Sequence, residues 1–148
     1  MSLAIPIPLL ERIRDHGRDA YPHECCGLLI GRAEGSAKSV IDLQPLSNAR
    51  EDSPQNRYLI SPDDWLHADQ ESRKAGLDII GVYHSHPDHP ARPSEFDREH
   101  AFPWYSYIIL NVARGEPGDM TSWILQDDRS AFDREDLISP DEGRKQCP

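Results

Sequence analysis

The segment at residues 77–85, LDIIGVYHS, constrains the fold most, because it is the strongest strand candidate in the chain. Its isoleucine, valine and tyrosine residues favour extended backbone, and a proline-rich loop follows it. Side chains alternate along a strand, so His84 and His86 point to the same side of the chain where this strand ends. The sequence therefore predicts a strand that presents two imidazole groups to one site.

The elements expected on either side of this segment combine helices with strands. The clearest helix start is Ser61, an N-cap followed by a proline and two aspartates, and Gly76 should close this helix. Helices are also expected at 8–20 and 94–100, and strands at 25–31, 39–46, 57–60, 104–112, 120–126 and 131–139. This order indicates an α/β (α+β) fold in which helices flank a mixed, largely antiparallel sheet. We expect one domain over residues 1–139 and a disordered tail over 140–148.

Charge and cysteine content exclude several classes of protein. The 148 residues carry a formal net charge of −10, which argues against nucleic acid or an anionic membrane as a partner, because phosphate binding needs clustered lysine and arginine. No apolar run approaches the roughly 18 residues of a membrane span, and the N-terminus lacks the features of a signal peptide. Cys25, Cys26 and Cys147 are too few for a disulfide framework. We expect a soluble cytoplasmic protein.

A candidate for a third metal ligand follows the loop after the histidine pair. Ten residues separate His86 from Asp97, and a helix that begins at Ser94 places Asp97 in its first turn, where the loop can fold it back onto the histidines. Two imidazoles and one carboxylate suit zinc, and a set of three protein ligands leaves a position for water, which is the pattern of catalytic zinc sites.

This spacing, with a serine three residues before the aspartate and a glutamate far upstream, resembles the JAMM (MPN-plus) metalloproteases. The blocks YPHECCGLLIG (21–31) and GVYHSHPDHPARPSEFD (81–97) are similar to the bacterial branch of that family. The resemblance implies an MPN/JAMM domain with a cytidine-deaminase-like sheet and one Zn²⁺ per chain, held by His84, His86 and Asp97.

The resemblance also implies a reaction and two catalytic roles. Glu24 would be the general base that takes a proton from the attacking water and passes it to the leaving amine, and Ser94 would donate a hydrogen bond to the oxyanion. The family hydrolyses peptide or isopeptide bonds at the C-terminus of ubiquitin-like β-grasp proteins, and bacterial relatives process sulfur carriers with a Gly-Gly tail. The resemblance therefore implies a zinc metallopeptidase whose partner is a ubiquitin-like or sulfur-carrier protein.

The same residues also have structural interpretations. His84 and His86 are compatible with ordinary strand histidines, and Asp97 with a capping box that involves Ser94 alone. Glu24 is compatible with a solvated acid at the start of a strand. On these interpretations the chain is a catalytically silent binding module of the MPN type.

Two further features allow alternatives. Cys25 and Cys26 adjoin Glu24 and allow a cysteine peptidase, although small buried strand residues explain them as well. His89 is compatible with a substrate contact or with a solvated loop. A zinc nucleobase deaminase is excluded, because the Cys-x-x-Cys pair that such enzymes need is absent from the sequence.

A glycine-rich tail offers few side chains, so we expect the enzyme to bind it through backbone hydrogen bonds, as in strand addition to a sheet edge. The segment 81–86 is the expected edge, and the polar loop 47–56 is the expected flap over it.

Overall fold

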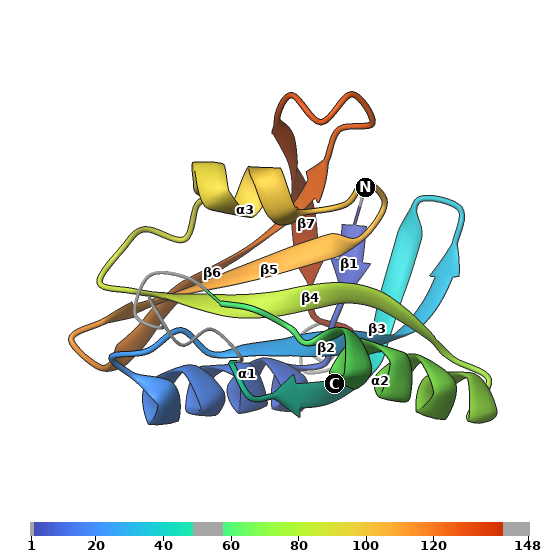
Figure 1. Cartoon of the computed structure of the whole chain (residues 1–148), viewed down its shortest axis with the longest axis horizontal. Helices are drawn as coiled ribbons and strands as arrows, with labels where there is room; N and C mark the ends of the chain where they lie inside the picture. The colour runs from blue at the N-terminus through green and yellow to red at the C-terminus, as the bar shows by residue number, and fades with distance from the viewer. Residues whose placement is uncertain (1, 49–57, 141–148) are drawn as a thin grey trace, which may run out of the picture.

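The computed structural model describes residues 2–48 and 58–140, which form seven strands and three helices (Figure 1). The elements, in chain order, are β1 (Ser2–Ala4), α1 (Ile7–Ala20), β2 (Cys26–Glu34), β3 (Ala37–Leu46), α2 (Pro62–Lys74), β4 (Asp78–Pro87), α3 (Glu95–His100), β5 (Ser106–Ala113), β6 (Glu116–Leu125) and β7 (Phe132–Ile138). None of the helices in these ranges has the length and hydropathy of a membrane-spanning segment.

The strands form one mixed sheet in the order β1-β3-β2-β4-β5-β6-β7. The pairs β2–β3, β2–β4, β5–β6 and β6–β7 are antiparallel, and β4–β5 is parallel. The short β1 pairs in parallel with both β3 and β7, so the strand order closes on itself. The α/β fold with a mixed, largely antiparallel sheet is therefore confirmed.

A bulge in β4 determines which face of the sheet receives the histidines. Leu29 of β2 pairs with Gly81, but Ile30 pairs with Ile79, so Ile80 is an extra residue. A shift of one residue turns every following side chain to the opposite face. Beyond the bulge, alternate residues place His84 on the same side as Val82.

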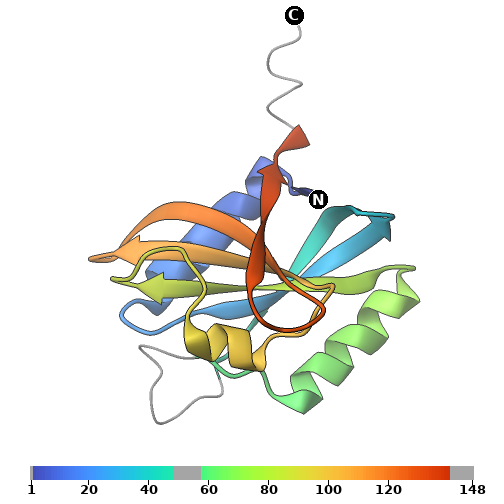
Figure 2. The same cartoon turned by 90° about the horizontal axis from the view of Figure 1, so that it is seen from above.

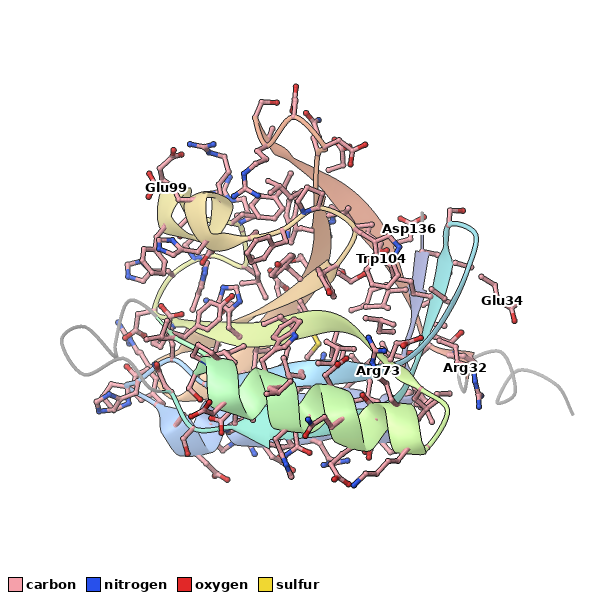
Figure 3. All side chains as sticks on the ribbon, turned by 45° about the vertical axis from the view of Figure 1, so that its right-hand side comes forward. Arg32, Glu34, Arg73, Glu99, Trp104 and Asp136 are labelled. Atoms are coloured by element: carbon pink, nitrogen blue, oxygen red, sulfur yellow. The ribbon has the colours of Figure 1, made fainter. Side chains whose placement is uncertain are left out.

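Two hydrophobic clusters fill the two sides of the sheet. One contains Ile13 of α1 with Leu29, Ile80, Tyr83 and Leu110, and the other contains Ala68 of α2 with Leu28, Val82 and Tyr107. Figure 2 shows α1 on one side of β4 and α2 and α3 on the other. Charged side chains such as Arg32, Arg73 and Glu99 are exposed and point away from this core (Figure 3).

Helix α2 begins and ends as its sequence predicts. Ser61 Oγ accepts a hydrogen bond from Asp64 N at 3.1 Å, and Pro62 occupies the first turn. Gly76 follows the helix with a φ of 75°, a left-handed conformation that glycine adopts without strain.

Two expectations about strands are wrong. Residues 58–60 are not a strand, and residue 57 lies outside the described residues. The segment 81–86 is not a sheet edge, because β4 pairs with β2 on one side and with β5 on the other. In addition, β1 was not expected, since three residues are too short for a periodic signal.

Two other expectations fall mainly on undescribed parts of the chain. Most of the flap 47–56 lies outside the described residues, and so does the disordered tail 140–148 apart from Pro140. A single domain over 1–139 stays a prediction.

Candidate metal centre and active site

The structure brings His84, His86 and Asp97 together in one buried cluster. The histidines lie near the end of β4, and Asp97 lies in the first turn of α3. His84 Nε2 lies 3.2 Å from His86 Nε2 and 3.4 Å from Asp97 Oδ1, and His86 Nε2 lies 3.1 Å from Asp97 Oδ2. One possible ligand atom from each residue falls within 4.8 Å of the others. The cluster therefore has the composition and size to hold one metal ion.

Contacts behind each histidine orient the rings. The Nδ1 atom of His86 lies 2.8 Å from the carbonyl oxygen of Pro90, and because a carbonyl only accepts, Nδ1 carries the proton and Nε2 has a free lone pair. The ring of His84 stacks on Tyr58 with centroids 4.5 Å apart. These contacts turn both Nε2 atoms toward Asp97.

Asp97 takes part in the capping box and also faces the two histidines. Its Oδ2 accepts a hydrogen bond from Ser94 N at 2.9 Å, and its backbone N donates to Ser94 Oγ at 3.0 Å, so the capping box is present. The same carboxylate faces both histidines. The cap thus fixes the carboxylate orientation at the cluster.

The electrostatics of the cluster favour the forms that bind metal. Burial lowers the pKa of His84, with Asp97 acting in the opposite direction. Burial by itself would raise the pKa of Asp97, but His84, followed by the close contacts of the carboxylate with both histidine rings, holds it well below its usual range. A neutral imidazole and an ionised carboxylate are the states in which these groups ligate a cation.

Glu24 lies just before β2 and is only 4% exposed. Cys26 pairs with His84 across β2 and β4, which brings the segment that carries Glu24 beside the cluster. The Oε1 atom of Glu24 is buried without a hydrogen-bond partner among the described residues. Burial, followed by the charge of Asp97, raises the pKa of Glu24 to about 9. A cation held by Asp97 would lower this pKa again and favour ionised Glu24, which is the form that can accept a proton.

An open pocket joins the cluster to the two residues for which the resemblance implies catalysis. Glu24, His86 and Ser94 line a space of 640 Å³, together with His89 and Arg92. Ser94 is exposed, and its hydroxyl hydrogen is not used in the bond from Asp97 N. All five residues singled out for the reaction thus belong to one region of the molecule. His89 lies at its rim, and its role stays a prediction.

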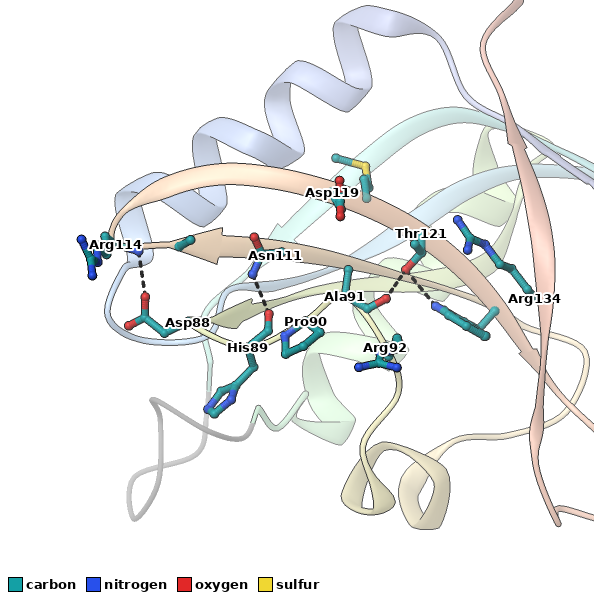
Figure 4. Close-up of a pocket in the computed structure, with 13 residues that line it drawn as sticks. Asp88, His89, Pro90, Ala91, Arg92, Asn111, Arg114, Asp119, Thr121 and Arg134 are labelled. Carbon is teal, nitrogen blue, oxygen red and sulfur yellow. Dashed lines mark hydrogen bonds between the residues drawn. The ribbon is translucent and has the colours of Figure 1, made fainter.

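Polar residues of β5 and β6 hold the loop between His86 and Asp97 (Figure 4). Asn111 Nδ2 donates to the carbonyl oxygen of His89, and Thr121 Oγ1 donates to that of Ala91, both at 2.6 Å. Thr121 in turn accepts a hydrogen bond from Trp123 Nε1 at 2.8 Å. No local motif identifies these anchors, because they lie far from the loop in the sequence.

A second anchor fixes the start of the same loop. Asp88 has a φ of 59°, and its carboxylate accepts hydrogen bonds from Tyr21 Oη and from the backbone N of Arg114, both at 2.7 Å. The loop is therefore tied to the segment after α1 and to the β5–β6 turn.

The two cysteines beside Glu24 do not have the properties of nucleophiles. Cys25 and Cys26 are buried and unpaired. Burial raises the pKa of the Cys25 thiol to about 11 and that of Cys26 to about 12. Reactive cysteines have lowered pKa values and partial exposure. The cysteine-peptidase alternative is thus disfavoured, and packing explains these residues.

Comparison with named proteins identifies relatives that match most of the chain. The desampylase of Haloferax volcanii is 34% identical over 104 residues, which cover 70% of this chain and 73% of that protein. The probable TtuB-protein conjugate cleaving protease of Thermus thermophilus is 38% identical over 112 residues, covering 76% of this chain and 72% of the relative.

Solved structures share the fold over almost the whole chain. A protein of Desulfitobacterium hafniense has a TM-score of 0.81 and 34% identity, with 93% of this chain and 92% of that one covered. A JAB1/MPN domain protein of Archaeoglobus fulgidus is 19% identical, with a TM-score of 0.55 over 93% of this chain and 99% of the other, which shows the fold alone. Residues 6–126 match the family described as prokaryotic homologues of the JAB domain. The chain therefore belongs to this JAB/JAMM family, as a hydrolase of the JAMM type.

Proposed function

We propose that this protein is a zinc metallopeptidase that hydrolyses the peptide or isopeptide bond at the C-terminus of a ubiquitin-like or sulfur-carrier β-grasp protein. The observation that carries the proposal is the buried His84, His86 and Asp97 cluster with Glu24 and Ser94 around the same pocket. The named relatives, a desampylase and a TtuB-protein conjugate cleaving protease, support a protein conjugate as the substrate.

The donor set of the cluster fits Zn²⁺. Two imidazole nitrogens and one carboxylate oxygen are ligands that zinc accepts, and all three side chains are buried. When bound there, zinc would polarise the scissile carbonyl and lower the pKa of a water molecule from 15.7 to roughly 7. We propose one ion per chain.

Glu24 is proposed as the general base and acid. Its unpartnered Oε1 atom takes a proton from the attacking water and later gives it to the nitrogen of the leaving amine. Glu24 is the only carboxylate besides the ligand Asp97 that the structure describes at this site. It therefore handles the proton at both steps.

Ser94 is proposed to stabilise the oxyanion. Its Oγ atom accepts a bond from Asp97 N, so the hydroxyl hydrogen is available for the charge that develops on the substrate. The capping box holds this hydroxyl in place before the substrate arrives.

Replacing Ser94 with alanine is expected to lower kcat on the order of 10²–10³-fold, the usual loss for one oxyanion donor. The same change should remove about 1 kcal/mol of folding free energy, because the cap of α3 is lost. Ser61→Ala is the matched control, since Ser61 caps α2 in the same way, with its Oγ 3.1 Å from Asp64 N. Kinetics and melting curves of both variants are the measurement, and an equal loss of kcat in both would remove Ser94 from the mechanism.

An apolar groove on the other side of the cluster is proposed to receive the substrate tail. This groove encloses 280 Å³ and is continuous with the metal site, because Asp97 forms part of its wall. Tyr58, Trp65 and Phe102 also line it. It takes the place of the expected edge at 81–86, which the sheet covers on both sides.

The proposal is tested by mass spectrometry of β-grasp proteins with extended C-termini after incubation with the zinc-loaded protein. We expect cleavage after Gly-Gly and none when Ala-Val replaces it, because small residues let the carbonyl reach the metal. Equal cleavage of both tails would indicate a general peptidase. Binding without turnover would favour the silent binding module.

We also propose the cytoplasm as the location. Both described cysteines, Cys25 and Cys26, are unpaired, which fits a reducing compartment.

A further inference from the structure

A large groove extends from the active-site pocket over the outer face of β5 and β6 (Figure 4). It encloses 980 Å³, and His89, Pro90 and Arg92 line both the groove and the active-site pocket. The groove is therefore a continuation of the active site, on the side away from the apolar groove beside Asp97.

The position of Glu24 indicates which part of the substrate passes this way. Glu24 and Ser94 line the pocket that opens into the large groove, whereas the apolar groove is lined by Asp97 without either of them. The group that gives the proton to the leaving amine thus lies on the side of the large groove. The released half of the substrate should leave through it.

The charges of the groove are unusual for this chain. Arg92, Arg114 and Arg134 all line it and are exposed, in a protein with a formal net charge of −10. Among the residues that the structure describes, no acid lies within ion-pair distance of these three side chains. Their guanidinium groups are therefore available to a ligand.

Two acidic residues, Asp88 and Asp119, line the groove together with the arginines. Asp88 accepts hydrogen bonds from Tyr21 Oη and Arg114 N, so its carboxylate is committed to holding the loop, although its charge still lies near Arg114. Arg134 lies over the ring of Trp123, 5.9 Å from its centroid, which presents a broad cationic surface.

We propose that this arginine-lined groove binds the protein from which the ubiquitin-like tail is released, through acidic residues that flank its modified lysine. The inference rests on the proposed function, and it states which class of protein carries the ubiquitin-like tail in the conjugate that the enzyme cleaves. An acidic segment fits better than the single carboxylate of one released amino acid, because three arginines line a groove of 980 Å³ that extends beyond the active-site pocket. Paired opposite charges of this kind set partner choice and association rate.

The test uses one β-grasp protein that ends in Gly-Gly, joined by an isopeptide bond to the central lysine of three nonapeptides. The lysine is flanked by aspartates, by serines or by lysines. The wild type should cleave the acidic conjugate with a kcat/KM on the order of tenfold above the serine conjugate, and salt should reduce this preference. The double variant R114E/R134E should reverse the order and prefer the basic conjugate.

Two controls separate charge recognition from damage to the enzyme. The aminomethylcoumarin amide of the same β-grasp protein has no charged leaving group, so the wild type and the double variant should cleave it at equal rates. Arg32→Glu reverses a charge on the β2–β3 hairpin, at a residue that does not line the groove, and should keep the wild-type order of the three conjugates.

The inference is overturned if the double variant keeps the wild-type order, or if all three conjugates are cleaved equally by the wild type. If the wild type cleaves neither the coumarin amide nor any conjugate, the proposed function is wrong. Fluorescence anisotropy of the labelled acidic nonapeptide then tests the groove separately. We expect the peptide to bind R114E/R134E about tenfold more weakly than the wild type, and equal binding to both would refute the inference.

Discussion

Glu24→Gln is expected to abolish nearly all hydrolysis and to leave the zinc content at the wild-type level. Glutamine keeps the shape of the side chain but cannot take a proton, and loss of a general base lowers rates by about 10²–10⁴-fold. The Oε1 atom is buried without a partner among the described residues, so no neighbouring group is placed to replace it. The measurement is kcat/KM on a Gly-Gly conjugate, together with metal analysis of the same sample.

Glu135→Gln is the matched control for this substitution. Glu135 is also a buried glutamate with an unpartnered oxygen, Oε2, and its Oε1 accepts a hydrogen bond from Ser122 Oγ at 2.8 Å. It lies in β7, outside the pocket that contains Glu24. We expect normal activity in this variant, and wild-type activity in Glu24→Gln would exclude Glu24 from the reaction.

Removal of any one metal ligand is expected to have an effect of similar or greater size. His84→Ala, His86→Ala and Asp97→Asn should each reduce zinc from about one per chain to below about 0.1, because each removes one of the three ligands proposed for the ion. Hydrolysis should fall to background in all three. Asparagine is chosen at position 97 because its amide oxygen can still accept the hydrogen bond from Ser94 N, so the helix cap persists.

Other histidines serve as controls for the ligand variants. His16 lies in α1, where its Nδ1 atom is hydrogen-bonded to Tyr83 Oη at 2.7 Å. His89 lies in the loop that lines the active-site pocket. His16→Ala and His89→Ala should retain one zinc per chain. Inductively coupled plasma mass spectrometry measures the metal, and a full complement of zinc in all three ligand variants would show that the site is elsewhere.

The elements with strong local signals were predicted closely. Helix α2 has a serine cap, a proline in its first turn and a glycine after its end, and the strand around 77–85 has a run of strand-forming residues. The capping box of Ser94 and Asp97 was also expected. Residues 58–60 do not form the expected strand, and Tyr58 and Ile60 are apolar because both pack on the hydrophobic cluster beneath α2.

The sequence was sufficient to predict the candidate metal cluster, because alternation along one strand and the helix cap that positions Asp97 are local properties. The surroundings of this cluster follow from contacts between segments that lie far apart in the sequence. Glu24 reaches the site because β2 pairs with β4. The loop between His86 and Asp97 is held by Asn111 of β5 and Thr121 of β6. Strand partners are selected by burial and closure of the whole sheet, and these depend on contacts between residues far apart in the chain. For the same reason the arginine-lined groove has no counterpart in any contiguous stretch of the sequence.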